Sequence, residues 1–525
     1  MFRWVRIGLV LAVGMFFFLW HSPLLSETGR VRGFNSDAAI IALMGKKMLE
    51  GRGFDIFFWG QNYIGPLTSM FIAATGLFLG AVSPLALRVG TMTEVLLGIG
   101  FIGMAVARVD RRAAVVTMVA LAITPPVILR MMITPLGAEM AFVLASALLA
   151  LFLWFPRPLL LGLVAGFGWW MNQQVVFTLL AIVLVLGWRS PAVRTFLPRP
   201  LDLWRLQGLS GIPQAFAWVL TRLGALLLAL FIVFDLLHFD FLPFVLGRAT
   251  DALLLLLVPL LILYLHDWRS WRLPPLAPLA RFAAGFALGY APVWLGRIFG
   301  WYDRTYVFGF RLNYPSEVVE QVRTFGAVAA HWIGAPPNVL GVLYALVFCG
   351  FVAVGVWSGR TEARVLLALI PLANVAFYFA TAGGKPHYLI ASVGPLFGVA
   401  ALGAVELWSR YRVPVLAGAA IAVLSLGMSA KLMHREVLAE PDPLPLLAQV
   451  RAANCAVTYA DFWVAYRYRF LDGERGAWIP YLSQNRTRAE SFAAQRLPGQ
   501  RCLVEKDGTV RQIAHDLPIV HPARR

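Results

Sequence analysis

Apolar runs recur along the whole of this chain and constrain its fold more than any other feature. Of its 525 residues 59% are hydrophobic and 14% are charged, whereas soluble proteins have roughly 45–50% apolar and about 25% charged residues. A hydrocarbon core of about 30 Å is crossed by about 20 helical residues, whose backbone groups pair internally. The sequence therefore predicts a mainly α-helical, polytopic membrane protein with about thirteen spans, at 4–20, 88–107, 113–129, 137–155, 159–171, 172–188, 216–235, 243–265, 279–298, 338–357, 363–381, 387–408 and 412–430.

The net charge of +18 follows the expected topology and gives no reason to invoke nucleic acid. Arginines gather in the connections that are cytoplasmic if the N-terminus is cytoplasmic, as the positive-inside rule requires. Counting Tyr63–Gly80 as a further span would move Asp110–Arg112 to the outer side. We therefore expect Tyr63–Gly80 to be a juxtamembrane helix in the first outer loop. Met1–Trp20 has no small-residue cleavage site after it and is expected to be a retained first span.

The composition changes after the last apolar run. We expect residues 1–430 to form the membrane domain and residues 431–525 a small α/β domain on the outer face. Its predicted elements are the strands Cys455–Tyr459 and Arg501–Glu505 and the helices Pro443–Ala453 and Phe462–Phe470. Cys455 and Cys502 both lie in this domain, and they could form a disulfide or remain two unpaired thiols.

The first outer loop concentrates polar side chains beside a membrane, where they are costly unless they are used or paired. Gln61, Asn62 and Tyr63 carry groups suited to hydrogen-bonding sugar hydroxyls, and Trp59 offers a ring for stacking. The alternative interpretation is an interfacial aromatic belt with helix-capping amides. Asp37 lies at the start of the helix-forming run Ala38–Glu50, where an N-cap role would explain it without chemistry.

Several motifs together resemble the GT-C superfamily of polyprenyl-phosphate-sugar-dependent glycosyltransferases, which includes protein O-mannosyltransferases and aminoarabinose transferases of lipid A. The resemblance covers nearly the whole chain. Relatives usually carry Asp-Glu at the start of the first loop, whereas this chain has Asp37-Ala38. The motifs are the acidic first loop, FWGQNYIGPL at 58–67, the basic turn Val109–Arg112, a Pro-containing span before Arg130–Glu139, KPHYL at 385–389 and YADFWVAYRYRFLDGER at 459–475.

The resemblance implies transfer of a sugar from a polyprenyl phosphate to an acceptor hydroxyl, with inversion at the anomeric carbon. Asp37 would be the base that takes the acceptor proton. Lys385, with His387 and Tyr388, would stabilise the leaving phosphate. An interfacial lysine that extends to the headgroup region is the alternative for Lys385. Lys46, Lys47 and Arg130 are weaker cation candidates.

Further candidates lie in the other predicted outer segments. Glu139 and Asp303 could orient the acceptor or help to hold a divalent metal, although solvated outer-loop acids need no such role, and Arg304 adds a cation. The sequence has no GxxxxGK[ST], no HExxH and no closely spaced Cys/His set, which argues against a nucleotide-driven pump or a familiar zinc enzyme. No cofactor is required by the sequence, and the metal question stays open.

The leading hypothesis is a glycosyltransferase of the bacterial inner membrane, monomeric, with a periplasmic site and C-terminal domain. Its acceptor would be a glycolipid, a lipid-linked glycan or a protein. One alternative is an O-antigen ligase or polymerase, which would use a lipid diphosphate donor. Another is a lipid or solute transporter, which would use the charged residues inside the predicted spans: Glu94, Arg222, Arg248 and Asp251.

Overall fold

The computed structural model describes residues 2–59, 64–189, 276–299, 313–358, 361–380, 386–480, 497–505 and 507–517. The chain divides into two compact units. The unit formed by Val183–Ala280 and Val307–Arg311 falls mostly outside these ranges. The features described below belong to the other unit, which contains the first outer loop and the C-terminal domain.

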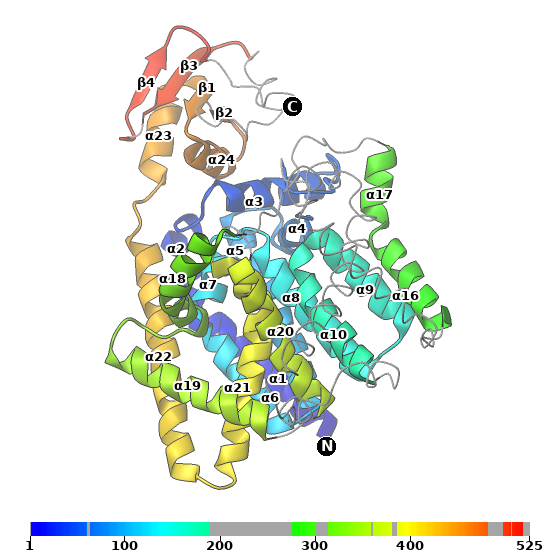
Figure 1. Cartoon of the computed structure of the whole chain (residues 1–525). Coiled ribbons are helices and arrows are strands. Elements are labelled where there is room, and N and C mark those ends of the chain that lie inside the picture. The colour runs from blue at the N-terminus through cyan, green and yellow to red at the C-terminus, as the bar shows by residue number, and fades with distance from the viewer. Residues whose placement is uncertain are drawn as a thin grey trace. The chain divides into compact units, whose positions relative to one another are not determined.

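The described residues are mainly helical, as predicted (Figure 1). Among the described residues, five helices are long and apolar enough to cross a membrane, or six if one bent pair counts as a single span, so the predicted number of thirteen is not confirmed. The predicted spans 216–235 and 243–265 lie outside the described residues. The apolar runs correspond to α1 (Phe2–Trp20), α5 (Pro84–Ala107), α6 (Arg111–Ile123), α7 (Pro126–Ile133), α8 (Ala138–Trp154), α9 (Pro158–Met171), α10 (Val176–Arg189), α16 (Leu276–Gly289), α17 (Ala291–Ile298), α19 (Val339–Trp357), α20 (Glu362–Ala380), α21 (Val393–Trp408) and α22 (Arg412–Ala439).

The predicted continuous span 113–129 is instead broken into α6 and α7, which meet at an angle of 52°. Pro125 and Pro126 lack the N–H groups that a continuous helix needs at this point. Thr124 has a left-handed φ of 71° at the break. The Nε2 atom of His21 lies 2.8 Å from the Thr124 hydroxyl, and its Nδ1 atom lies 3.0 Å from Nε2 of His434. The break is thereby tied to the end of α1 and to α22.

Helices α9 and α16 cross at paired glycines. Gly162 and Gly166 on α9 are four residues apart, as are Gly285 and Gly289 on α16. A Cβ atom at Gly162 would lie 2.0 Å from the carbonyl oxygen of Phe282, and the other three glycines are equally crowded by backbone. Small residues at this spacing allow membrane helices to approach closely.

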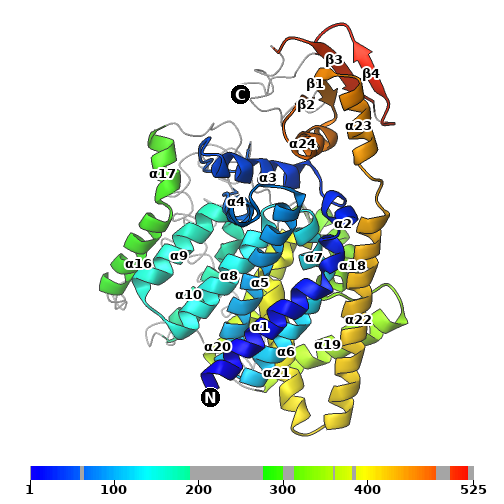
Figure 2. The same cartoon turned by 180° about the vertical axis from the view of Figure 1, so that it is seen from behind.

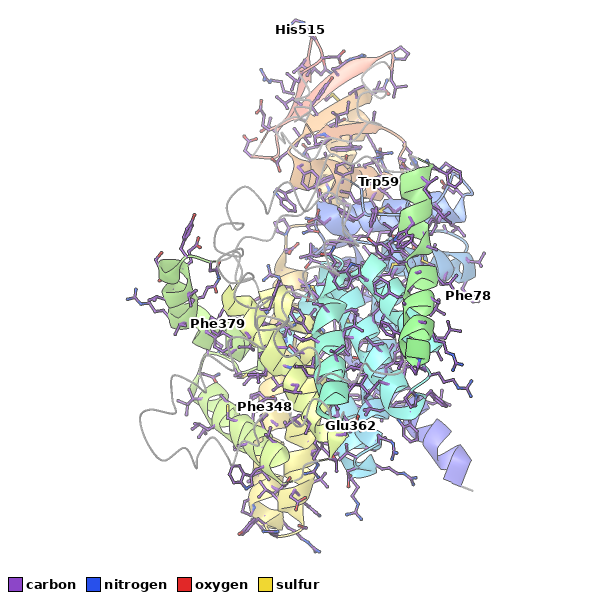
Figure 3. All side chains as sticks on the ribbon, turned by 45° about the vertical axis from the view of Figure 1, so that its right-hand side comes forward. Trp59, Phe78, Phe348, Glu362, Phe379 and His515 are labelled. Carbon is purple, nitrogen blue, oxygen red and sulfur yellow. A yellow bond between two sulfur atoms is a disulfide. The ribbon has the colours of Figure 1, made fainter. Side chains whose placement is uncertain are left out.

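The first outer loop forms the short helices α2 (Glu27–Val31), α3 (Ser36–Leu49) and α4 (Leu67–Leu79). Helix α4 has 13 residues, which gives about 20 Å of length and is too short to cross the hydrocarbon core. Its end exposes Leu77 and Phe78, and Phe78 points outward from the ribbon in Figure 3. Other described helices of the membrane domain are η1 (Ser22–Leu24), η2 (Gln173–Val175), α18 (Pro315–Ile333) and η4 (Pro386–Ser392).

The described part of the C-terminal domain contains a small sheet and two helices. Both predicted helices are present, as α23 (Leu444–Ala452) and α24 (Phe462–Leu471). The predicted strands are β1 (Cys455–Ala460) and β3 (Gln500–Val504), and the sheet also contains β2 (Ala477–Pro480) and β4 (Val510–Ile513), which the sequence did not reveal. The strand order is β2-β1-β3-β4, with only β4 antiparallel to its neighbour.

Cys455 and Cys502 form a disulfide between the neighbouring strands β1 and β3. Of the two alternatives that the sequence left open, the structure therefore has the bonded one. Helix α22 continues to Ala439, beyond the end of the predicted span at 430, before the chain enters this domain.

The C-terminal domain packs on the first outer loop through α24 and α3, which lie against each other in Figures 1 and 2. Phe462, Tyr466 and Phe470 of α24 are buried in one apolar cluster with residues of α3 and with Phe34. The Ser36 hydroxyl donates a hydrogen bond to the carbonyl oxygen of Phe462. The start of α3 is therefore held by a segment more than 400 residues away in sequence.

A charged cluster closes the other end of this contact. The carboxylate of Glu474 accepts hydrogen bonds from Lys46, Arg52 and Arg469, each at 2.8 Å. Partial burial by itself would raise the pKa of Glu474, but the hydrogen bonds and positive charges of Lys46 and Arg469 outweigh it and lower the pKa to about 2. Lys46 is therefore paired within the protein, and this ion pair accounts for its charge without a role in substrate binding.

We predict that Glu474→Gln weakens the docking of the C-terminal domain. Because the carboxylate is stabilised in the folded protein, its contribution is complete above its ordinary pKa of 4.5 and disappears as pH falls towards 2. Since Arg52 is about half exposed, solvent screening should limit the loss at neutral pH to about 1–2 kcal/mol.

The measurement is thermal unfolding of the two proteins in nanodiscs between pH 7 and pH 3. The difference between wild type and Glu474→Gln should shrink as pH falls below 4.5. Glu505→Gln is the matched control, because Glu505 pairs only with the exposed Arg511 among the described residues. A Glu474→Gln protein as stable as wild type at pH 7 would contradict this role.

Candidate active site

Asp37 occupies the first turn of α3, and its side chain is 9% exposed. The N-cap of the helix is Asn35, whose side-chain oxygen accepts a hydrogen bond of 3.0 Å from the backbone N–H of Ala38. Neither Ser36 nor Asp37 is thus the cap, so an N-cap role does not explain Asp37. The N-terminal turn of a helix favours a negative charge. A carboxylate at this position suits the binding or deprotonation of a polar ligand.

Trp59 and Lys47 meet on a single acid in the same loop. The indole N–H of Trp59 donates to Oδ2 of Asp55 at 2.8 Å, and Nζ of Lys47 lies 2.8 Å from Oδ1 (Figure 3 labels Trp59). The Trp59 ring also packs against the apolar cluster around α3. Its indole N–H is therefore committed to the loop, and its ring edge is what could contact a ligand. Gln61, Asn62 and Tyr63 lie outside the described residues.

Glu139 is completely buried at the start of α8. Its carboxylate accepts hydrogen bonds from the Thr68 hydroxyl at 2.8 Å and from the backbone N–H groups of Gly137 at 3.0 Å and Leu136 at 3.3 Å. These contacts join the first turn of α4 to the first turn of α8. They give Glu139 a structural task, in place of the solvated outer-loop position that the sequence suggested.

The segment that begins at Ile64 is anchored by the same region. Ile64 pairs with Asn172 as an isolated β-bridge, and the Asn172 side chain donates to the carbonyl oxygen of Gly137 at 2.8 Å. Gly65 donates its N–H to the carbonyl oxygen of Met171 at 2.9 Å. Asn172 lies in the turn between α9 and α10. Ile64 and Gly65 are thus fixed to the turns that precede α8 and η2.

Glu94, on α5, is also fully buried and is close enough to Glu139 and Thr68 to interact with them electrostatically. Neither of its carboxylate oxygens has a hydrogen-bond partner among the described residues. The described residues contain no group of three or more His, Cys, Asp or Glu side chains that could hold a metal ion. The other charged residues of the transporter hypothesis, Arg222, Arg248 and Asp251, lie outside the described ranges.

The proposed phosphate-binding residues are described only in part. Pro386–Ser392 forms the 3-10 helix η4, which contains His387 and Tyr388 and precedes α21. The predicted span 387–408 is therefore irregular over its first turns. Helix η4 packs against α8 and α20, which places it beside the helix that carries Glu139. Lys385, Asp303 and Arg304 lie outside the described residues.

An apolar groove of about 320 Å³ lies between α9 and the α16–α17 pair. Trp170 forms part of its wall and donates its indole N–H to the carbonyl oxygen of Ile56 in the first outer loop, at 2.9 Å. The groove has the lining that a hydrocarbon chain requires. Sequence reasoning missed it, although the glycine pairs of α9 and α16 signal the helix crossing that forms it. Its other lining residues are Leu163, Val164, Phe167, Leu288, Gly289 and Pro292.

We predict that Glu139→Ala destabilises the protein, because the substitution leaves two buried donors and one partly buried donor without an acceptor. Each unsatisfied buried group costs about 1–3 kcal/mol, so the apparent melting temperature and the yield of folded protein should both fall. Thr68→Val removes one of these donors and should have a smaller effect. A folded Glu139→Ala protein of wild-type stability, with altered ligand binding alone, would contradict the structural task. The measurement is thermal unfolding in nanodiscs.

Comparison with known proteins identifies the fold. No protein-family model and no curated protein matches the sequence. Among solved structures, ArnT from Cupriavidus metallidurans in the apo state has 13% identity and a TM-score of 0.50, and the match covers 97% of this chain and 94% of ArnT. The structure of ArnT bound to undecaprenyl phosphate matches with 13% identity, a TM-score of 0.49 and coverage of 96% and 93%.

The oligosaccharyltransferase of Archaeoglobus fulgidus, solved with a tethered acceptor peptide, has 11% identity and a TM-score of 0.49. The match covers 89% of this chain but only 63% of that enzyme. The similarity to ArnT, in contrast, extends over nearly the full length of both proteins. The chain therefore shares the overall fold of ArnT.

Proposed function

We propose that this protein is a membrane glycosyltransferase that moves a sugar from a polyprenyl-phosphate donor to an acceptor hydroxyl, with Asp37 as the base. The observation that carries the proposal is the position of Asp37 in the first turn of α3, capped by Asn35 and held by the C-terminal domain. A fold shared with ArnT over nearly its whole length supports it. One ArnT structure contains undecaprenyl phosphate, and we propose the same class of donor here.

In the proposed reaction the acceptor oxygen attacks the anomeric carbon from the face opposite the phosphate, so the configuration inverts. The new C–O bond forms as the bond from that carbon to the phosphate oxygen breaks. Asp37 takes the acceptor proton, and polyprenyl phosphate leaves with the electron pair. Lys385, His387 and Tyr388 would stabilise the charge on the leaving phosphate. Trp59, Gln61, Asn62 and Tyr63 would contact the sugar, and Asp303 and Arg304 the acceptor.

The Cys455–Cys502 disulfide supports a location for the C-terminal domain outside the cytoplasm, because disulfides persist in oxidising compartments. We propose that the protein lies in a bacterial inner membrane, with a cytoplasmic N-terminus and a periplasmic site. A polyprenyl-phosphate donor fits this location, since nucleotide sugars are made in the cytoplasm. The acceptor would be a glycolipid, a lipid-linked glycan or a protein.

The test is sugar transfer by purified protein in nanodiscs, from labelled polyprenyl-phosphate sugars to extracted lipid and protein acceptors. We predict that wild type transfers sugar and that Asp37→Asn lowers kcat at least about 100-fold, as expected for loss of a general base. Glu27→Gln is the matched control, because Glu27 is an almost fully exposed acid of the same loop. The folded state of each variant is checked by thermal unfolding.

The outcomes separate the hypotheses. Transfer by Asp37→Asn at the wild-type rate would support the glycosyltransferase hypothesis but would rule out Asp37 as the base. Transfer only from lipid diphosphate donors would favour the ligase or polymerase class. Substrate flux into vesicles without transfer would favour the transporter.

We propose further that the groove between α9 and α16–α17 holds part of the donor's isoprenoid chain. Leu163→Trp should fill the groove, raise KM for long-chain donors several-fold and leave a short-chain donor unaffected, because only the long chain reaches the groove. Leu160→Trp is the control, since Leu160 is a leucine of the same helix, 37% exposed and outside the groove. Equal KM values for Leu163→Trp and wild type with long-chain donors would contradict this placement.

A further inference from the structure

Arg88, near the start of α5, is a completely buried arginine. Its guanidinium donates to backbone carbonyl groups of two separate segments. Nη1 donates to the carbonyl oxygens of Ile133 at 2.5 Å and Met132 at 3.3 Å, at the end of α7. Nη2 donates to those of Gly29 at 3.4 Å and Arg32, in and just after α2. No described acid lies within ion-pair distance of Arg88, so these carbonyl groups are its direct partners, and Glu440 adds a longer-range attraction.

The segment from Gly29 to Phe34 leads directly into α3. Gly33 has a left-handed φ of +76°, and a Cβ atom there would lie 2.8 Å from Val437 and 2.9 Å from Ile133, so no other residue fits without a shift. The N–H of Gly33 donates to Glu440 at 2.9 Å. Arg32 donates to the carbonyl oxygen of Leu438. The segment is therefore fixed on one side by Arg88 and on the other by the end of α22 and the residue that follows it.

Phe34 transmits this arrangement to α3. The guanidinium carbon of Arg88 lies 5.7 Å from the centre of the Phe34 ring, and that of Arg467 in α24 lies 5.5 Å from the same ring. Phe470 contacts the ring edge-on at a centroid distance of 5.9 Å. Asn35 then caps α3 and Asp37 follows two residues later. A displacement of the Gly29–Phe34 segment would therefore move Asp37, the candidate base.

We propose that Arg88 is a positioning residue, which fixes the Gly29–Phe34 segment and through it the location of Asp37. This inference rests on the proposed function. The effect of Arg88 on Asp37 passes through backbone carbonyl groups and the Phe34 ring. A planar fork of five N–H donors can serve two segments at once, whereas a lysine ammonium carries its three donors on one nitrogen and cannot span the same two segments.

The test compares Arg88→Lys with wild type in nanodiscs by two independent measurements. The first is hydrogen exchange of peptides that cover Gly29–Ile41, which should become at least about 10-fold faster while peptides from α19 and α21 stay unchanged. The second is steady-state sugar transfer. Here kcat should fall about 10–100-fold with KM for the donor changed less than about 3-fold, because a displaced base impairs the reaction more than donor binding.

Two further variants keep the outcome decisive. Phe34→Leu retains an apolar side chain but removes the ring, and it should give the same local exchange pattern with a smaller loss of kcat if Arg88→Lys does not fold. Arg323→Lys is the control for the exchange itself, because Arg323 is an exposed arginine of α18. Unchanged exchange over Gly29–Ile41 would overturn the inference, and so would faster exchange with wild-type kcat. Absence of transfer by wild type would overturn the proposed function, and the exchange result would still decide whether Arg88 fixes the segment.

Discussion

The burial of α3 on all sides is the constraint on which the rest of this structure depends. Every residue from Ser36 to Gly45 is buried, although the helix belongs to a loop and contains an acid. Such a helix cannot exist on a solvated surface, because its apolar side chains need cover on every face. Helix α4 approaches it closely at Gly45, where a Cβ atom would lie 2.8 Å from the carbonyl oxygen of Ser69. The opposite cover comes from α24, so the first loop and the C-terminal domain stabilise each other.

This arrangement makes the position of Asp37 depend on contacts between the N-terminal and C-terminal parts of the sequence. Ser36 is hydrogen-bonded to Phe462, and Lys46 forms an ion pair with Glu474. The C-terminal domain therefore holds α3 near both of its ends. The C-terminal domain is therefore an integral part of the candidate site. Glu139 has a comparable task on the membrane side, since it ties the start of α4 to the start of α8. Buried polar contacts of this kind, each fully paired, specify one arrangement of the elements that they join.

Local pattern in the sequence predicted local structure and failed where distant partners decide. Apolar runs predicted the membrane helices, and alternating and helical patterns predicted α23, α24, β1 and β3. The Pro125–Pro126 pair was visible, but the break of the span at Thr124 also depends on His21 and His434, which come from other elements. Lys46 and Glu139 could be interpreted only as outer-loop charges, because their partners are set by the tertiary fold. The cap of α3 was misplaced because Asn35, Ser36 and Asp37 are all good cap residues, and only the backbone conformation distinguishes them.

The central claim is that Asp37 faces the reacting sugar. It is tested most directly by an experimental structure of the Asp37→Asn protein in nanodiscs with a polyprenyl-phosphate sugar bound. The account predicts that the side chain of residue 37 and the anomeric carbon are separated by a space that fits one acceptor hydroxyl. It also predicts that the phosphate lies towards η4 and the lipid chain towards α9 and α16. A sugar bound on the opposite side of the membrane domain, or separated from residue 37 by the body of α3, would contradict it.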